Sequence, residues 1–212
     1  MSEFKALNGA VLKGDINTAT AEMQKAIDDG YDVQNIIDNG LITAMDEVGE
    51  RYSKGLLFVP QMLRSAKTMQ ECMKLIEPLL QKGGVTPKGK MLIGTVRGDL
   101  HDIGKNLVSM MMESAGFTIT DLGVDVPPDK FIQKVQEVEP DIVAMSALLS
   151  TTMPAMPETI EALVKNGLRD KVKVMIGGAP VTENYAREIK ADAYASDAGT
   201  AVIKAKKLLG IG

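Results

Sequence analysis

The sequence has few of the side chains from which metal centres and catalytic sites are commonly built. Its 212 residues include one histidine, one cysteine and no tryptophan, and aromatic residues make up 4%. The single Cys72 excludes an intrachain disulfide, so we expect a reducing compartment and a small apolar helix residue at this position. A structural zinc site is excluded as well, because it requires several cysteine or histidine ligands.

Long hydrophobic runs and blocks of one charge are also missing. No segment reaches the ~18 continuous apolar residues that a membrane helix requires, and residues 1–5 lack the basic-then-apolar pattern of a secretion signal. The 24 basic and 28 acidic side chains are mixed along the chain, so no basic block could neutralise a run of phosphates. We therefore expect a cytoplasmic protein that binds neither a membrane nor nucleic acid.

The patterns that are present divide the chain into two parts, and the first part is helical. Asp15 and Asp32 can each cap a helix, and apolar side chains follow Asp32 at steps of three and four residues. Pro60 lies where the first turn of a helix tolerates proline, ahead of another apolar stripe. The pattern predicts a four-helix bundle over residues 1–80, followed by a linker of glycine, proline and polar residues at 81–89.

The second part alternates short runs rich in β-branched residues with helical stretches. Strands are predicted at 91–96, 118–122, 142–146, 172–176 and 193–195, and helices at 103–114, 129–138, 157–165, 183–189 and 199–208. These units predict an α/β domain over residues 90–212, with a doubly wound parallel sheet of the Rossmann-like or flavodoxin-like kind. Its ligand should lie in the loops at the carboxyl ends of the strands, which are 97–101, 123–125, 146–152 and 177–180.

The histidine of the chain lies in the first of these loops. If Asp99 and His101 belong to an extended segment, their side chains project to the same side, and the carboxylate can accept the proton of one ring nitrogen. The other nitrogen would then be available to a metal. Gly104 lacks a side chain one turn later, which would let a bulky ligand approach. The alternative is that Asp99 is a helix N-cap and His101 a surface residue.

Other ligand and reaction classes do not fit this loop. A phosphate-binding P-loop needs four residues between its glycines and Ser or Thr after the lysine, whereas Gly98 and Gly104 are separated by five and Asn106 follows Lys105. The dinucleotide fingerprint G-x-G-x-x-G is absent, and no serine has a nucleophile-elbow sequence around it. What remains is a ligand that needs one protein nitrogen and much room.

These residues resemble the cobalamin-binding domain of methionine synthase, of methylmalonyl-type mutases and of the corrinoid proteins of methyltransferase systems. The family pattern is Asp-x-His-x-x-Gly, then Ser-x-Leu, then Gly-Gly. Here residues 99–104 are followed after 41 residues by Ser146-Ala147-Leu148, and after 28 more by Gly177-Gly178. All three pieces match in order and spacing.

The resemblance implies a cobalamin or related cobamide cofactor, methylated in its carrier state. His101 would be the lower axial ligand of its cobalt and Asp99 the partner that orients the ring. The nucleotide tail of the cofactor would insert beside the sheet, where Gly177 and Gly178 would give it space. The implied cofactor-binding residues of this domain are Asp99, Leu100, His101, Asp102, Ile103, Gly104, Ser146, Leu148, Ser150, Thr151, Thr152, Gly177 and Gly178.

The first part of the chain resembles the helical cap module of methionine synthase and of methyl-carrier corrinoid proteins, over residues 45–52 and 58–66. In that module an aromatic residue and a leucine press on the upper face of the corrin. Tyr52 and Val59 occupy those positions here, where Phe and Leu are commoner. The alternative is that both residues belong to the core of the bundle.

With this cap and no catalytic domain, the chain resembles the stand-alone corrinoid proteins of methylamine, betaine and related methyltransferase systems. The resemblance implies a carrier that holds a methyl group on cobalt and has no complete active site of its own. Its partners would be a substrate:corrinoid methyltransferase, a second methyltransferase acting on tetrahydrofolate or a thiol, and a reductive activase. The alternatives are a cobalamin-binding subunit of a radical mutase, which lacks a helical cap, and a cobalamin-dependent sensor, which carries a DNA-binding segment.

Overall fold

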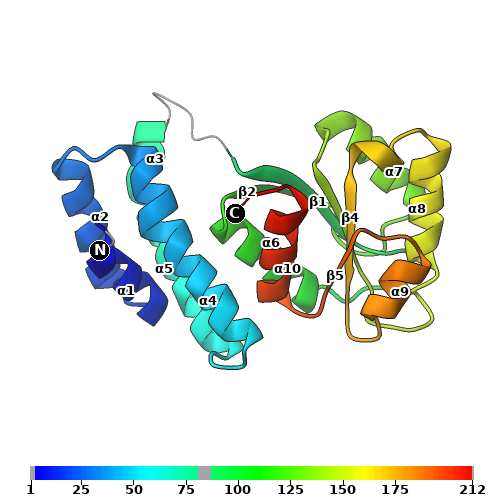
Figure 1. Ribbon diagram of the computed structural model, residues 1–212, viewed down its shortest axis with the longest axis horizontal. Coiled ribbons are helices and arrows are strands. Elements are labelled where there is room, and N and C mark those ends of the chain that lie inside the picture. The colour runs from blue at the N-terminus through cyan, green and yellow to red at the C-terminus, as the bar shows by residue number, and fades with distance from the viewer. Residues whose placement is uncertain (1–2, 81–86, 212) are drawn as a thin grey trace. The chain divides into compact units, whose positions relative to one another are not determined.

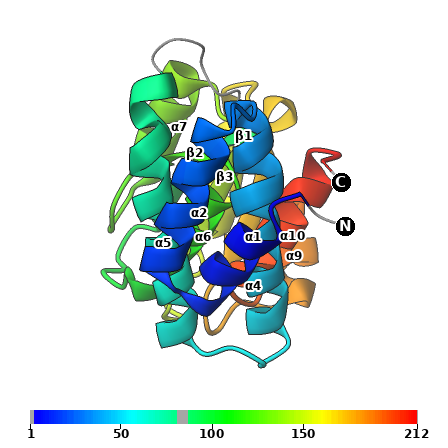
Figure 2. The same ribbon diagram turned by 90° about the vertical axis from the view of Figure 1, so that its left-hand side faces the viewer.

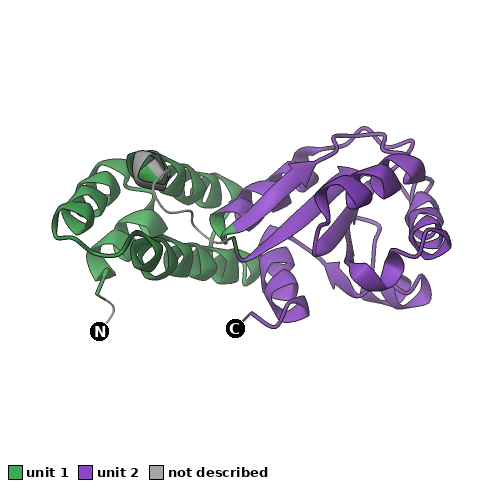
Figure 3. Ribbon diagram, turned by 90° about the horizontal axis from the view of Figure 1, so that it is seen from above, with its two compact units in different colours: residues 1–87, 114–116 green, residues 88–113, 117–212 purple. Residues whose placement is uncertain are grey.

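The computed structural model describes residues 3–80 and 87–211, with only the backbone of residues 77–80. The chain forms two compact units, residues 1–87 with 114–116, and residues 88–113 with 117–212 (Figures 1 and 3). Of the predicted linker, residues 81–86 lie outside the described residues, and Gly89 is already the first residue of a strand. Apolar side chains are buried within both units.

The first unit is built from helices (Figure 2). They are α1 (Lys5–Lys13), α2 (Ile16–Asp28), a continuous segment of α3 (Val33–Asn35), the π-helix η1 (Ile36–Ile42) and α4 (Thr43–Ser53), and then α5 (Val59–Leu80). The α5 helix packs against α1, α2 and α4. Asp15 and Asp32 cap α2 and α3 as predicted, because their carboxylates accept backbone N–H groups of the first helical turn.

The apolar stripe predicted after Pro60 is the buried face of α5. Its fully or almost fully buried members are Met62, Ala66, Met69, Cys72 and Ile76. Burial, and to a smaller extent the neighbouring Glu71 carboxylate, raises the pKa of the Cys72 thiol to about 11. This position agrees with the expectation of an apolar helix residue rather than a reactive thiol.

The helix predicted after Asp32 departs from regular α-geometry over Ile36–Ile42. The side-chain amide of Asn8 in α1 donates to the backbone carbonyls of Asn39 at 2.9 Å and Gly40 at 2.7 Å. A Cβ on Gly40 would lie 2.8 Å from the Leu7 side chain, so glycine permits this close approach of α1. The widened turn therefore accompanies a tertiary contact that the local apolar spacing does not encode.

Within the described residues, the second unit is a five-stranded parallel sheet with the order β2-β1-β3-β4-β5. The strands are β1 (Gly89–Thr95), β2 (Phe117–Asp121), β3 (Ile142–Ser146), β4 (Lys173–Gly177) and β5 (Ala193–Ala195). This is the flavodoxin-like order of a doubly wound fold, which confirms the predicted fold class. Thr95 pairs with Ser146 and Ser146 with Gly177, so the register brings the ends of β1, β3 and β4 to the same edge.

Helices cover both faces of this sheet (Figure 1). The α6 (Ile103–Ser114) and α10 (Ala198–Leu208) helices lie on one face, and α7 (Pro128–Val138), α8 (Ala155–Lys165) and α9 (Glu183–Glu188) on the other, while a short 3-10 helix η2 (Arg169–Lys171) precedes β4. Strands covered on both faces are buried along their length, as β3 and the interior of β1 are here. Within residues 3–80 and 87–211, no helix has both the length and the apolarity needed to cross a bilayer.

Candidate functional site

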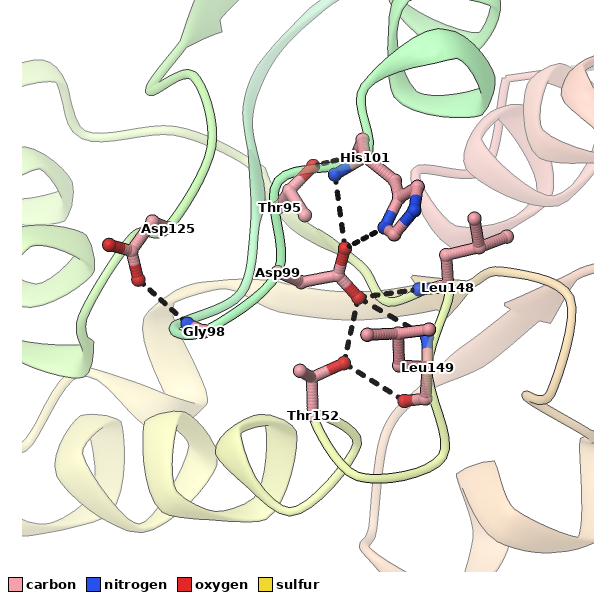
Figure 4. Close-up of polar contacts among 8 residues, drawn as sticks. All are labelled: Thr95, Gly98, Asp99, His101, Asp125, Leu148, Leu149 and Thr152. Carbon is pink, nitrogen blue, oxygen red and sulfur yellow. Dashed lines mark hydrogen bonds and ion pairs between the residues drawn. The ribbon is translucent and has the colours of Figure 1, made fainter.

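The loops after β1 and β3 leave the sheet at the point where its strand order reverses. The chain passes from β1 to β2 on one side, while β3 flanks β1 on the other. Doubly wound sheets bind their ligands at such a switch point. Figure 4 shows the two loops joined through the side chain of Asp99.

The Asp99 carboxylate is fully buried and accepts hydrogen bonds from both loops. Its Oδ1 accepts the backbone N–H of His101 at 3.1 Å and lies 2.7 Å from Nδ1 of the His101 ring. Its Oδ2 accepts the backbone N–H groups of Leu148 at 2.8 Å and Leu149 at 3.3 Å, and the Thr152 hydroxyl at 2.7 Å. One carboxylate therefore fixes the β1 loop against the β3 loop.

These donors decide the charge of Asp99. Burial raises the pKa of the carboxyl group, whereas hydrogen bonds from the Thr152 hydroxyl and from His101 lower it, and the balance holds the pKa of Asp99 well below its usual range. Asp99 is therefore an anion throughout the physiological pH range. The alternative in which Asp99 is a helix N-cap is wrong, because α6 begins at Ile103.

The ionised partner also fixes the state of the His101 ring. An ionised carboxylate only accepts hydrogen bonds, so in the neutral imidazole Nδ1 carries the proton and Nε2 carries the lone pair. The His101 side chain is 50% exposed, and Nε2 has no partner among the described residues. The Thr95 hydroxyl, buried at the end of β1, donates to the His101 carbonyl at 2.9 Å and holds the backbone of this residue. The arrangement presents one oriented nitrogen donor at the sheet edge.

Exposed apolar side chains lie in the same two loops as this nitrogen donor and at the start of α6. Leu100 and Ile103 are 72% and 79% exposed, and Leu148 and Leu149 are each 43% exposed. A Cβ added to Gly104 would meet none of the described atoms within 4 Å, so the start of α6 is open. A corrinoid is a large ring, mostly apolar, around a metal that can take one axial ligand, and these residues fit it.

The other predicted site residues lie on the same edge but play different parts. Ser150 and Thr151 are exposed in the β3 loop, whereas the hydroxyl of Thr152, predicted to border the nucleotide tail, is bound to Asp99. A Cβ on Gly178 would lie 1.8 Å from the Ala147 carbonyl oxygen, and one on Gly177 would lie 2.9 Å from that of Ala195. Close backbone approach therefore accounts for both glycines, and space for a tail stays a prediction.

Two B12-binding domain models match the chain. One matches residues 89–204 and the other residues 3–77. A dimethylamine corrinoid protein of Methanosarcina acetivorans is 44% identical over 207 residues, covering 97% of each chain. The chain belongs to the corrinoid proteins. Its cofactor is therefore a cobalamin or a related corrinoid, as the resemblance implied.

Solved structures agree with this family. A cobalamin-binding protein from Desulfitobacterium hafniense matches this corrinoid protein with a TM-score of 0.85 and 32% identity, over 98% of this chain and 99% of the other. A methanol:cobalamin methyltransferase complex from Methanosarcina barkeri matches with a TM-score of 0.82 and 30% identity, over 98% of this chain and 79% of the matched chain. Corrinoid proteins of this kind belong to methyltransferase systems.

In the first unit of the corrinoid protein, the predicted cap residues Tyr52 and Val59 are both half-buried. The most exposed apolar side chains of the same segment are Leu56 and Phe58, at 68% and 70%. An apolar surface therefore exists between the two predicted positions. A role for Tyr52 and Val59 against the corrin stays a prediction.

Proposed function

We propose that this corrinoid protein carries a methyl group on cobalt from a substrate-specific methyltransferase to a second methyltransferase that acts on tetrahydrofolate or a thiol. The methyl donor would be a methylamine, a betaine or a related methylated compound, and a reductive activase would restore the cofactor after oxidation. The corrinoid supplies the methyl-accepting and methyl-donating metal. The protein binds it, orients it and presents it to its partners, in the cytoplasm.

The observation that carries this proposal is the ring of His101, held at Nδ1 by a buried anion and exposed at the sheet edge. We propose that Nε2 of His101 is the lower axial ligand of cobalt. Asp99 accepts the Nδ1 proton of the ring, which leaves the lone pair on Nε2 and holds the ring in one orientation. Leu100, Asp102, Ile103 and Gly104 would contact the lower face.

The remaining predicted contacts follow the two loops and the first unit. We propose that Ser146, Leu148, Ser150 and Thr151 border the cofactor beside β3, and that Gly177 and Gly178 lie next to its tail. Thr152 would act through Asp99. Tyr52 and Val59, with the exposed side chains between them, would contact the upper face and shield the methyl group from water.

The similarity to a dimethylamine corrinoid protein over 97% of each chain supports a carrier rather than a mutase subunit or a sensor. So does the B12-binding match to the helical unit at residues 3–77, because a mutase subunit lacks such a cap. The full-length similarity covers both parts that the carrier needs, and the domain match covers the helical part.

The assignment of His101 as the cobalt ligand can be tested by isotope labelling, because histidine occurs once in the chain and the label therefore marks His101 alone. The protein is produced with histidine labelled with the heavier stable nitrogen isotope, loaded with cobalamin and reduced to Co(II). Paramagnetic resonance should then show the nitrogen splitting of the cobalt signal change from a triplet to a doublet. A splitting that the label leaves unchanged would mean that the cofactor keeps its own base and that His101 is not the ligand.

The variant His101→Ala is the matched control. It should fold and melt only slightly below the wild-type apo-protein, because the half-exposed ring contributes little to the core and the Asp99 carboxylate keeps its backbone donors and the Thr152 hydroxyl. It should show no protein-derived nitrogen splitting. The carrier role itself is tested with methylcobalamin-loaded protein, which should lose its methyl group only when a methyltransferase and tetrahydrofolate or a thiol are both added.

A further inference from the structure

Asp125, in the loop after β2, has a backbone conformation that is unusual for a residue with a side chain. Its φ is 52°, in the left-handed region that glycine adopts without cost and that aspartate tolerates. Neither the fold class nor the proposed site accounts for an aspartate here. A residue held in such a conformation is retained when something else in the structure uses it.

Among the described residues, the hydrogen bonds of Asp125 go to the turn that carries Asp99, and Figure 4 shows the one to Gly98. The Asp125 carboxylate accepts the backbone N–H of Gly98 at 2.7 Å, and the Asp125 N–H donates to the carbonyl of Asp99 at 2.9 Å. The turn itself is closed by the Asp99 N–H, which donates to the Val96 carbonyl at 3.1 Å. Asp125 therefore forms hydrogen bonds with the Gly98 N–H and the Asp99 carbonyl, one on each side of the peptide bond that joins these residues.

We propose that Asp125 is a positioning residue for the cobalt ligand, which acts by fixing the backbone of Asp99 and through it the ring of His101. This inference rests on the proposed role of His101 as the axial ligand. The Asp99 side chain can orient the ring only if its own Cα is held still, and ligand geometry must be kept within about 0.5 Å to be productive. The β3 loop holds the Asp99 carboxylate, and Asp125 holds the Asp99 main chain.

The carboxylate of Asp125 is what a glycine at this position could not supply. Glycine would adopt the same φ and would keep the N–H that donates to Asp99. It would lack the acceptor for the Gly98 N–H. Asparagine would keep both the acceptor oxygen and the tolerance of a positive φ. The pair Asp125→Gly and Asp125→Asn therefore isolates the acceptor.

The test measures the affinity of the apo-protein for cobinamide, a corrinoid without a base of its own, whose binding reports the protein ligand. Asp125→Gly should weaken cobinamide binding about threefold to tenfold, the effect of one hydrogen bond, and Asp125→Asn less than about twofold. In the His101→Ala background Asp125→Gly should have no further effect, because a residue that acts through His101 cannot act without it. Glu139→Gly, another positive-φ residue that follows α7 at the opposite edge of the sheet, should leave the affinity unchanged.

The outcomes separate the two proposals. If His101→Ala binds cobinamide as tightly as the wild type, the proposed ligand is wrong. If His101→Ala weakens binding but Asp125→Gly does not, or if Asp125→Gly has the same effect in both backgrounds, only the role of Asp125 is overturned. If Asp125→Gly does not fold, hydrogen exchange of the Gly98 amide in the wild-type apo-protein provides the test. Exchange at the rate of an unstructured peptide would mean that Asp125 does not hold this amide.

Discussion

At the scale of single residues, Asp99 is tightly constrained because its buried charge is matched by donors from two loops. Asp99→Asn replaces one acceptor oxygen by a donor that faces N–H and O–H groups. We expect the free energy of unfolding of the apo-protein to fall by about 2–4 kcal/mol at neutral pH. Denaturant titration measures it, and Asp102→Asn, which alters an exposed carboxylate, should change it by less than about 0.5 kcal/mol.

The direction of the pKa shift of Asp99 determines how this difference in the free energy of unfolding depends on pH. The folded-state pKa lies below the ordinary value of 3.8, so the unfolded chain takes up the proton first as the pH falls. The contribution of Asp99 is therefore complete above the ordinary value and is lost as the pH falls through the folded-state value. The difference in free energy of unfolding between the wild type and Asp99→Asn should be constant from pH ~7 to ~5 and should decrease below pH ~4. A gap that widens in acid would contradict this charge assignment.

Two glycines of the site should respond in opposite ways to alanine. Gly178→Ala places a Cβ 1.8 Å from the Ala147 carbonyl oxygen at a φ of +126°, so we expect a loss of more than about 3 kcal/mol of stability. Gly104→Ala meets open space in the first turn of α6 and should stabilise the apo-protein by about 0.5 kcal/mol. It should nevertheless weaken corrinoid binding, because the proposed site places the corrin ring next to the added methyl group. Thermal melting and corrinoid titration of both variants measure these effects, and unchanged corrinoid affinity in Gly104→Ala would remove the proposed contact.

At the scale of elements, the first turn of α6 is anchored to the end of β2 by an ion pair between the buried Lys105 and Asp121, whose side chain is 37% exposed. The Lys105 side chain is 2% exposed, and its ammonium group donates to Asp121 and, at 2.8 Å, to Asn106. Asp121→Ala would leave this ammonium buried without its anion, so we expect a loss of about 2–4 kcal/mol. The exposed Lys134–Glu137 pair is the control, since Glu137→Ala should cost less than about 1 kcal/mol by the same denaturant titration. Equal losses in the two variants would show that burial does not strengthen the Lys105 pair.

The elements were predictable from the sequence where local patterns determine them. The α6 helix begins and ends where its apolar spacing indicates, and β3 and β5 coincide with their β-branched or alanine-rich runs. The widening of the helix after Asp32 was not predictable, because it accompanies a contact with Asn8 more than thirty residues away. Spacing along the sequence carries no signal for such a contact.

In the site, too, the local contact was predictable from the sequence and the long-range contacts were not. The Asp99–His101 contact joins residues two apart, so an extended backbone was enough to indicate it. The hydrogen bond from Thr152 to Asp99 spans 53 residues, and that from Gly98 to Asp125 spans 27. Only the parallel register of β1 with β3, and the path of the chain through β2, bring these residues to one edge.

At the scale of the whole molecule, each of the two units has its own exposed apolar surface. In the second unit it consists of Leu100, Ile103, Leu148 and Leu149, and in the first it includes Leu56 and Phe58. Large apolar side chains exposed together usually belong to a binding site. The proposed function requires both surfaces to contact the same corrinoid, on opposite faces of the ring.

Hydrogen exchange followed by mass spectrometry can test that requirement on the full chain. Bound cobalamin should slow exchange of backbone amides in residues 97–104 and 146–152, and also in residues 52–59, because the ring excludes water from both surfaces. Residues 166–172, which connect α8 to the start of β4 at the opposite edge of the sheet, should be unaffected. Protection confined to the second unit would mean that Tyr52 and Val59 do not contact the cofactor, while leaving the His101 assignment in place. Phe58→Ala should then leave corrinoid affinity unchanged, whereas contact by both units predicts weaker binding by about 1–3 kcal/mol, the contribution of one buried aromatic side chain.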